Sequence, residues 1–246
     1  MTNVTFTGWG ACVPPSVLTN DDLSTIVETS DEWITSRSGI KERRISHVSN
    51  SDMATLAAHR ALAAAGRTPD EIDYVLLATC TPDRQSPSAA CYVQTKIGAH
   101  RAAAADINAG CTGFLYGVSM AWGLIATGQA ARVLVIGSER ISSYLDLEER
   151  ATTVLFGDGA GAVVMEATTD DIGIRSLHLG ADGGGAEFLT ARGLGTDFVG
   201  TEARMAIVMD GAEIFKGAVK KMGDGAVAAI EEAGWEFDEV DLVIPH

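Results

Sequence analysis

The sequence predicts an α/β fold with a largely parallel sheet, and two observations support that prediction. Short apolar runs suited to strands alternate along the chain with longer segments that have helical periodicity. This order is typical of βαβ units, in which parallel strands are joined by helices. The composition, with 46% hydrophobic and 21% charged residues, is that of a globular protein and excludes disorder as the main state.

Each expected element has a local reason. The strands are apolar or alternating runs, expected in order at 4–9, 74–79, 102–107, 133–136, 159–166, 172–179 and 242–244. The helices follow capping residues or end at glycines, and they are expected from Thr19 through Val27 and at 31–38, 53–65 (capped by Ser51 and Asp52), 88–97, 112–127, 212–222 and 225–233. The glycine-rich segment 180–200 is expected to be a loop.

The segment 112–127 differs from the other expected helices because it is apolar on nearly every side. It carries Leu115, Val118, Trp122 and Ile125. A helix that is hydrophobic all round is normally buried, so we expect this one to lie between two layers of the fold.

Charge and cysteine content exclude several classes of function. The formal net charge is −15, which gives no general attraction to nucleic acid. None of the four cysteines lies in a C-x-x-C pair or in zinc spacing. No stretch is long enough to span a bilayer, and the first residues lack the features of a signal peptide. We therefore expect a cytoplasmic protein with reduced thiols, no metal and no membrane or nucleic-acid partner.

The chain contains one internal similarity. Residues 61–78 and 229–246 are 168 positions apart and are identical at seven of 18 positions, among them Gly66 and Gly234. The match has two interpretations: convergence on a common helix–turn–strand unit, or a duplicated module. With a duplication, the first module covers 1–168 and contains Cys111, and 169–246 is a partial second module that ends at His246.

Cys111 is the candidate nucleophile. It lies between an expected strand and the expected helix 112–127, flanked by Gly110 and Gly113. Unpaired N–H groups at a helix N-terminus stabilise a thiolate, so we expect the pKa of this thiol to be lowered. A thiolate attacks acyl carbonyls, and a helix-end N–H can hold the resulting oxyanion. The alternative, a small buried core residue, stays open for Cys111 and is preferred for Cys12, Cys80 and Cys91.

Five segments together resemble one family. They are Thr29–Arg43, Pro87–Cys91, Ala109–Phe114, Phe156–Ala162 and Val243–His246. With them the chain resembles the β-ketoacyl-[acyl-carrier-protein] synthase III family of thiolase-like condensing enzymes. The resemblance implies a duplicated αβαβα five-layer fold, with the second module incomplete in this chain. It also implies decarboxylative Claisen condensation of an acyl-coenzyme A with malonyl-acyl carrier protein, in fatty-acid or polyketide initiation.

The resemblance gives roles to two residues. Cys111 would take the acyl group, and His246 would bind the malonyl thioester carbonyl. The family's third catalytic residue, an asparagine about 30 residues beyond this histidine, and a C-terminal glycine loop are not in this sequence. The chain would then be either a fragment of a longer enzyme or a catalytically silent form that binds acyl-coenzyme A. A further alternative is a family-like acyltransferase that uses a different acceptor in secondary metabolism.

Other residues match binding positions of the family. Acyl-coenzyme A is the expected substrate, with no permanently bound cofactor. Trp33 and Arg37 match family positions that bind the adenine of coenzyme A. Thr29 and Arg150 match further contacts to the coenzyme. The positions that line the pantetheine tunnel are matched by Met209, Gly211 and Phe215. The cationic cluster Arg37, Lys41, Arg43 and Arg44 suits phosphate.

Lys216 matches a carrier-protein docking position, and Lys220 lies on the same helix face. Simple solubilisation of the helix would explain these lysines equally well. Ser86 stands where acetyl-preferring relatives place a phenylalanine across a homodimer interface. We therefore expect a homodimer with a pocket for longer or branched acyl groups.

Overall fold

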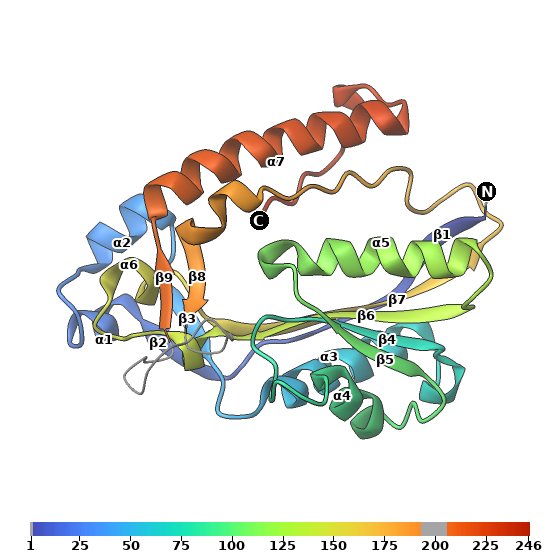
Figure 1. The fold of residues 1–246 in the computed structure, drawn as a ribbon, viewed down its shortest axis with the longest axis horizontal. Coiled ribbons are helices and arrows are strands. Elements are labelled where there is room, and N and C mark those ends of the chain that lie inside the picture. The colour runs from blue at the N-terminus through green and yellow to red at the C-terminus, as the bar shows by residue number, and fades with distance from the viewer. Residues whose placement is uncertain (1, 193–205) are drawn as a thin grey trace. The chain divides into compact units, whose positions relative to one another are not determined.

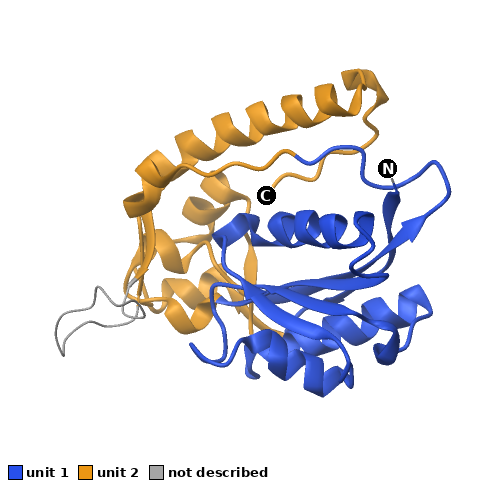
Figure 2. Cartoon of the chain, turned by 45° about the vertical axis from the view of Figure 1, so that its right-hand side comes forward, with its two compact units in different colours: residues 1–15, 46–140, 158–177 blue, residues 16–45, 141–157, 178–246 orange. Residues whose placement is uncertain are grey.

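The computed structural model describes residues 2–192 and 206–246. Its contacts group the chain into two compact units (Figure 2). Unit 1 comprises residues 1–15, 46–140 and 158–177, and unit 2 comprises residues 16–45, 141–157 and 178–246. The internal similarity predicts a different division, into duplicated modules at 1–168 and 169–246. Units defined by contacts do not test a duplication, so this division stays a prediction.

Unit 1 is built on one mixed five-stranded sheet with the order β1-β7-β6-β4-β5. The strands are β1 (Asn3–Cys12), β4 (Tyr74–Ala78), β5 (Ala103–Ile107), β6 (Arg132–Arg140) and β7 (Asp158–Thr168). β4 pairs in parallel with β5 and β6, whereas β7 runs antiparallel to both β6 and β1. The α/β class is thus confirmed, with one strand reversed.

Helices cover both faces of this sheet (Figure 1). α3 (Asn50–Ala65) and α4 (Ala89–Ile97) pack on one face, and α5 (Gly113–Ala126) packs on the other. Gly8 and Gly10 of β1 allow α3 to lie very close, because a Cβ on either residue would come within 2.5 Å of the α3 backbone.

α3 begins three residues earlier than predicted, at Asn50 rather than Met53. Ser49, not Ser51, is the N-cap, because its side chain accepts from the N–H of Asp52 while the Asp52 carboxylate accepts from the N–H of Ser49. This reciprocal capping box satisfies two N–H groups that the helix itself leaves unpaired.

One side of α5 is buried against the unit 1 sheet, and the expectation that the helix lies between two layers stays a prediction. Gly117, Val118, Ala121 and Ile125 face the sheet, but Leu115 and Met120 are each 49% exposed. Apolar periodicity identified the helix but could not show how many of its sides are covered.

Unit 2 consists of two small hairpins and several helices. β2 (Ser16–Thr19) pairs with β3 (Glu42–Ile45), and β8 (Leu189–Arg192) pairs with β9 (Ala206–Met209). The helices are α1 (Asn20–Ser24), α2 (Asp31–Ser38), α6 (Arg150–Thr153) and α7 (Gly211–Ala233). The sequence did not indicate these four strands, which are too short for clear alternation.

Two helix predictions in unit 2 need correction. α1 ends at Ser24, short of the predicted Val27, because the chain turns there with the N–H of Val27 bonded to Leu23. α7 is one continuous helix where two were predicted. Gly223 and Gly225 do not break it, since helix interiors tolerate single glycines at modest cost and Lys220 pairs with Asp224 (2.6 Å) across the junction.

Two predicted strands are absent from the described residues. In segment 172–179 the Ile174 N–H donates to the Val4 carbonyl (2.9 Å), but no residue of the segment is in a strand. Residues 242–244 have no strand beside them, and Ile244 is 85% exposed. Apolar runs mark potential strands, but a strand exists only where a partner accepts its hydrogen bonds.

Short 3₁₀ helices join these elements. They are η1 (Pro69–Glu71), η2 (Gly110–Thr112), η3 (Ile141–Tyr144), η4 (Gly183–Phe188) and η5 (Phe237–Glu239). η4 and β8 replace part of the loop predicted at 180–200, and residues 193–200 of that prediction lie outside the described residues.

The two halves of the internal similarity share local structure. α3 ends at Gly66 (φ 64°) and α7 ends at Gly234 (φ 71°), both left-handed. η1 and η5 follow at corresponding positions, each with a capping box. This correspondence of caps and turns supports the proposal of a duplicated module.

Candidate active site

The carboxyl ends of three neighbouring parallel strands converge at one edge of the unit 1 sheet. Ala78 of β4 lies opposite Ile107 of β5 and Gly137 of β6. Residues just beyond these positions therefore meet at the same edge, which is where α/β proteins commonly place their chemistry. Cys80, Cys111 and Glu139 all lie there.

Cys111 occupies the turn η2 that leads into α5. Gly110 adopts a left-handed backbone (φ 54°), which favours glycine and lets the chain reverse directly before the cysteine. Gly113 lies against β4, since a Cβ on it would be 3.2 Å from the Cβ of Ala78. The nucleophile candidate is thereby held beside the end of β4, at the start of α5, as the sequence predicted.

Glu139 is the penultimate residue of β6, and its carboxylate is turned toward the end of β4. The carboxylate accepts from the Cys80 backbone N–H (2.7 Å), from the Thr79 hydroxyl (3.2 Å) and from the Thr81 hydroxyl. No motif in the sequence pointed to Glu139. The only available signal was a carboxylate directly after an apolar strand.

Asn50 fixes this arrangement from α3. Its side-chain amide donates to the Thr79 hydroxyl (2.8 Å) and to the carbonyls of Thr81 (3.0 Å) and Ser138 (3.1 Å), and the Ser138 hydroxyl donates to its oxygen (2.5 Å). Asn50 and Ser138 are 3% and 2% exposed. Three separate chain segments are thus tied together by one buried amide.

The electrostatics correct the predicted lowering of the Cys111 pKa. Loss of solvation around the sulfur raises the pKa of this thiol, and the Glu139 carboxylate raises it further, against a smaller lowering by a backbone hydrogen bond. Although Cys111 as a residue is exposed, its sulfur is surrounded closely enough for this effect. Burial raises the pKa of Cys80 to about 12, together with the charge of Glu139, a hydrogen bond of the thiol to Glu139 and the charge of Cys111. Burial also raises the pKa of Glu139, whose donors only partly offset it.

A second carboxylate orders the neighbouring helix. Asp106, near the end of β5, accepts from the N–H groups of Ala89 and Ala90 (both 2.7 Å) and so caps α4. Cys91 is the next residue of α4 and is exposed, and Ser86 is exposed just before this helix.

The residues expected to bind adenine gather in unit 2. The guanidinium carbons of Arg37 and Arg150 lie 4.5 and 4.6 Å from the centre of the Trp33 ring. Arg150 also donates to the carbonyl of Glu28 (3.1 Å), beside Thr29, whose buried hydroxyl has no partner among the described residues. The structure brings these four predicted residues together, with the indole as their centre.

The predicted phosphate cluster is only partly available. Arg43 is 5% exposed and donates to Asn20 (2.8 Å) and to the Val154 carbonyl (2.7 Å), so it holds unit 2 together. Arg44 pairs with Glu42 (2.8 Å). Arg37 and Lys41 remain exposed.

The remaining predicted residues of unit 2 lie near α7 or at the end of the chain. Met209 and Gly211 flank the α7 N-cap Asp210, and Phe215 is 69% exposed one turn on. Lys216 and Lys220 share a face of α7 and pair within the helix with Glu213 (2.7 Å) and Asp224 (2.6 Å). His246 is exposed. It belongs to unit 2 and Cys111 to unit 1.

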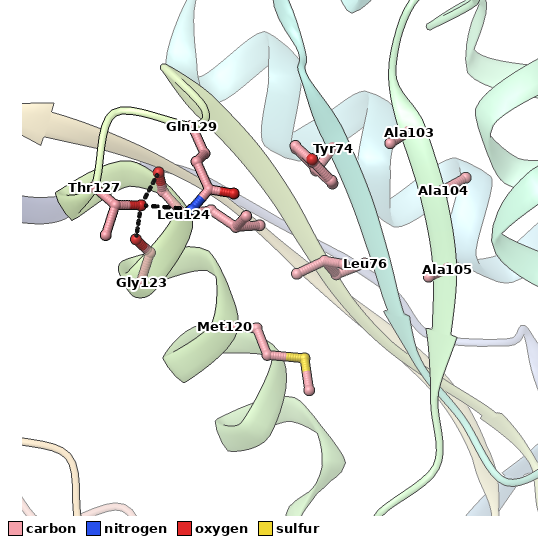
Figure 3. Close-up of a pocket in the computed structure, with 10 residues that line it drawn as sticks. All are labelled: Tyr74, Leu76, Ala103, Ala104, Ala105, Met120, Gly123, Leu124, Thr127 and Gln129. Atoms are coloured by element: carbon pink, nitrogen blue, oxygen red, sulfur yellow. Dashed lines mark hydrogen bonds between the residues drawn. The ribbon is translucent and has the colours of Figure 1, made fainter.

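Within the described residues, a groove, the absence of a metal-binding cluster and the absence of a membrane-spanning helix also bear on function. A groove of about 500 Å³ with an apolar lining runs between β5 and α5, where Leu76, Met120 and Leu124 face it (Figure 3). Among the described residues, no cluster of histidine, cysteine and carboxylate side chains suits a metal ion. None of the described helices is long and apolar enough to cross a membrane.

Comparisons with known proteins agree on one family. The family model for 3-oxoacyl-[acyl-carrier-protein] synthase III matches residues 105–183. The β-ketoacyl-[acyl-carrier-protein] synthase III 2 of Vibrio vulnificus (strain YJ016) is 48% identical over 243 residues, which are 98% of this chain and 67% of the relative. The synthase III of Geobacillus kaustophilus is also 48% identical, over 97% of this chain and 74% of its own length.

Solved structures show the same likeness. The synthase III of Aquifex aeolicus VF5 has a TM-score of 0.92 at 45% identity, covering 99% of this chain and 76% of that one. The priming β-ketosynthase of the R1128 polyketide pathway has a TM-score of 0.91 at 32% identity, covering 97% and 72%. The chain therefore belongs to the β-ketoacyl-[acyl-carrier-protein] synthase III family of thiolase-like condensing enzymes.

Proposed function

We propose that this protein condenses an acyl-coenzyme A with malonyl-acyl carrier protein to give 3-oxoacyl-acyl carrier protein. The observation that carries the proposal is the position of Cys111. It lies in a glycine-bounded turn at the start of α5, beside the carboxyl ends of three parallel strands, in a chain whose relatives are named for this reaction.

The proposed chemistry has two stages. The Cys111 sulfur attacks the acyl thioester carbonyl, the bond from that carbon to the coenzyme A sulfur breaks, and coenzyme A leaves as its thiol with the cysteine proton. The malonyl unit then loses CO₂, and its carbanion attacks the acyl-cysteine carbonyl and releases the Cys111 sulfur as a thiolate, which takes up a proton from solvent. His246 would donate a hydrogen bond to the malonyl thioester carbonyl as charge develops on it.

The Trp33 cluster is the proposed adenine site. An indole and a guanidinium both offer flat faces to a purine, and Arg37 and Arg150 already stack on Trp33. Thr29 has a hydroxyl free for a ligand within the described residues. Met209, Gly211 and Phe215, at the junction of β9 and α7, are the proposed pantetheine contacts.

Lys216 and Lys220 are the proposed contacts to the carrier protein. Both are more than 70% exposed, and their ion pairs within α7 are weak surface pairs that a strongly acidic partner can displace.

Ser86 is the proposed determinant of acyl length. The small serine leaves room where acetyl-preferring relatives carry a phenylalanine. We expect kcat/KM for octanoyl-coenzyme A to equal or exceed that for acetyl-coenzyme A. A strong acetyl preference would show that another residue closes the pocket.

A cytoplasmic homodimer is the proposed assembly. β5 forms an edge of the unit 1 sheet, and it is made of small residues without a charge until Asp106. Such an edge is a template for pairing with a second chain, and the apolar groove beside it adds surface to bury (Figure 3).

The proposed function is tested by release of CO₂ and formation of 3-oxoacyl-acyl carrier protein from acyl-coenzyme A and malonyl-acyl carrier protein. We expect both products to require the acyl-coenzyme A and to be lost in Cys111→Ala. Acyl transfer to Cys111 without CO₂ release would instead favour a different acceptor, as in secondary metabolism. The likeness to a polyketide priming enzyme makes polyketide initiation the variant of this function to examine beside fatty-acid initiation.

A further inference from the structure

Arg43 is a buried cation for which the proposed function gives no role. The sequence places it in a cluster suited to phosphate, but only 5% of the residue is exposed. None of the ion pairs between described residues includes it, and its Nε has no partner among those residues. Burying a guanidinium without a carboxylate costs free energy, so its position calls for a reason beyond filling space.

One nitrogen of this guanidinium is bonded to α6. The Arg43 Nη2 donates to the carbonyl of Val154 (2.7 Å), which is the C-cap of α6. The backbone after α6 also packs closely here, because a Cβ on Gly157 would be 3.1 Å from the Cβ of Arg43. α6 carries Arg150, whose guanidinium carbon lies 4.6 Å from the centre of the Trp33 ring. Arg43 therefore holds the helix that bears one of the two stacked arginines.

The other nitrogen is linked to α2 through Asn20. Nη1 donates to the side-chain oxygen of Asn20 (2.8 Å), and the Asn20 amide donates in turn to the Asp31 carboxylate (2.7 Å) and to the Ile40 carbonyl (2.8 Å). Asp31 is the first residue of α2, and Ile40 lies just beyond its end. Asn20 is 2% exposed, so little solvent competes for these bonds. The helix that carries Trp33 is thus bonded at both ends to the residue that Arg43 holds.

A small apolar cluster lies beside these hydrogen bonds. It is formed by Leu23, Ile34 and Val154, with Trp33 packed against it. Hydrophobic contact is non-directional, whereas a planar guanidinium donates in fixed directions. The placement of α6 beside α2 therefore depends on Arg43 and not on the apolar cluster alone.

We propose that Arg43 is a positioning residue for the coenzyme A substrate: its bonds to Val154 and Asn20 hold α6 beside α2, so that Arg150 lies over the Trp33 ring before the adenine binds. The inference rests on the proposed function in taking the Trp33 cluster as the adenine site. A site whose side chains are already ordered loses less conformational entropy when its ligand binds, so the affinity for coenzyme A is higher.

The test is a double-mutant cycle on the dissociation constant (Kd) of coenzyme A, measured by isothermal titration calorimetry with Arg43→Met, Arg150→Met and the double variant. Methionine keeps an unbranched side chain and removes both donors. We expect Arg43→Met alone to raise Kd about fivefold, the size expected when one long side chain must be ordered on binding. In the Arg150→Met background the same change should raise Kd less than about twofold, because the side chain that Arg43 positions is gone.

Two further variants separate positioning from charge. Arg43→Lys keeps the charge, but an ammonium lacks the planar fork that reaches both acceptors, so we expect Kd to rise at least about threefold. Arg44→Met removes the neighbouring cation of β3, whose side chain pairs with Glu42 (2.8 Å), and any effect it has should be the same with and without Arg150.

Three outcomes would overturn the proposal: an unchanged Kd in Arg43→Met, an equal rise in both backgrounds, or full affinity in Arg43→Lys. If Arg43→Met does not fold, Arg43→Lys replaces it in the cycle with the same expectations. Failure of the proposed function is a different result, since absent CO₂ release leaves the coupling between Arg43 and Arg150 in coenzyme A binding intact. A protein that does not bind coenzyme A overturns the inference.

Discussion

A carboxylate lies near each end of β6, and the pKa values of the two are shifted in opposite directions. At the carboxyl end, Glu139 is surrounded by neutral donors. At the other end, where Arg132 begins β6, Glu166 of β7 accepts from Arg67 (2.8 and 2.9 Å), from Arg132 (3.1 Å) and from the Thr7 hydroxyl (2.9 Å).

Burial is common to both groups, and their partners decide the outcome. Burial raises the pKa of Glu139, and its neutral donors do not reverse the change. Burial also acts to raise the pKa of Glu166, but the hydrogen bonds from Arg67 and Thr7 and the charges of both arginines outweigh it and lower the pKa. The ion pairs around Glu166 therefore stabilise one end of the sheet. At the other end, the polar site around Glu139 can shift the pKa of a reactive side chain.

The largest expected effect on stability comes from Glu166→Gln. This variant leaves two arginines beside a neutral amide, and we expect a loss of about 2 kcal/mol, below the 3–5 kcal/mol of a fully buried pair because both arginines keep some contact with solvent. Urea unfolding at pH 7 measures it. A change below about 0.5 kcal/mol would show that the cluster does not stabilise the sheet.

At the other end, Asn50→Ala should cost nearly as much. The buried amide makes four hydrogen bonds, and its loss removes its donors to Thr79, Thr81 and Ser138 and leaves the Ser138 hydroxyl only its longer bond to the Asn50 carbonyl (3.2 Å). We expect about 2 kcal/mol from thermal unfolding. The matched control is Asn108→Ala, which removes an exposed amide that makes only a long contact to Gly110 (3.5 Å) and should change little.

The pH dependence of stability should differ in sign between the two ends. Because the pKa of Glu166 is lowered on folding, its contribution is present above the unfolded value of about 4.3 and is lost as the pH falls through the folded value. Because the pKa of Glu139 is raised, its contribution is present below about 4.3 and is lost as the pH rises through the folded value.

Unfolding free energies from pH 3 to 8 test this opposition. The advantage of the unchanged protein over Glu166→Gln should grow with rising pH, and its advantage over Glu139→Gln should shrink. Slopes of the same sign for the two variants would contradict the comparison.

The smallest expected effect is that of Thr7→Val. The hydroxyl is one of four donors to Glu166, so the variant should lose about 1 kcal/mol and leave the ion cluster in place. A loss as large as that of Glu166→Gln would mean that Thr7, rather than the arginines, stabilises the carboxylate.

Local pattern was enough to predict most of unit 1. The strands near 4–9, 74–79, 102–107 and 159–166 and the helices 88–97 and 112–127 are confirmed within a few residues, because apolar runs and terminal glycines determine them locally. Segments 172–179 and 242–244 failed because a strand requires a partner, which no local pattern supplies. The four short strands of unit 2 were not predicted, because their pairing partners rather than a local apolar run determine them.

The site divides along similar lines. Cys111 and its glycines were visible because the turn into α5 is local. Its raised pKa was not, since the causes are burial of the sulfur and, second, the charge of Glu139, and both arise only once β4 pairs with β5 and β6. Likewise, Arg43 was predicted to belong to a phosphate-binding cluster, but the fold buries it, and it donates to Asn20 and to the Val154 carbonyl.

The central claim is that Cys111 accepts the acyl group. Intact mass after mixing the protein with an acyl-coenzyme A tests it most directly, with Cys111→Ala and the matched variant of another exposed cysteine, Cys91→Ala. We predict an increase of one acyl group in the unchanged protein and in Cys91→Ala, and none in Cys111→Ala. No adduct on the unchanged protein, or an adduct that persists in Cys111→Ala, would contradict the account.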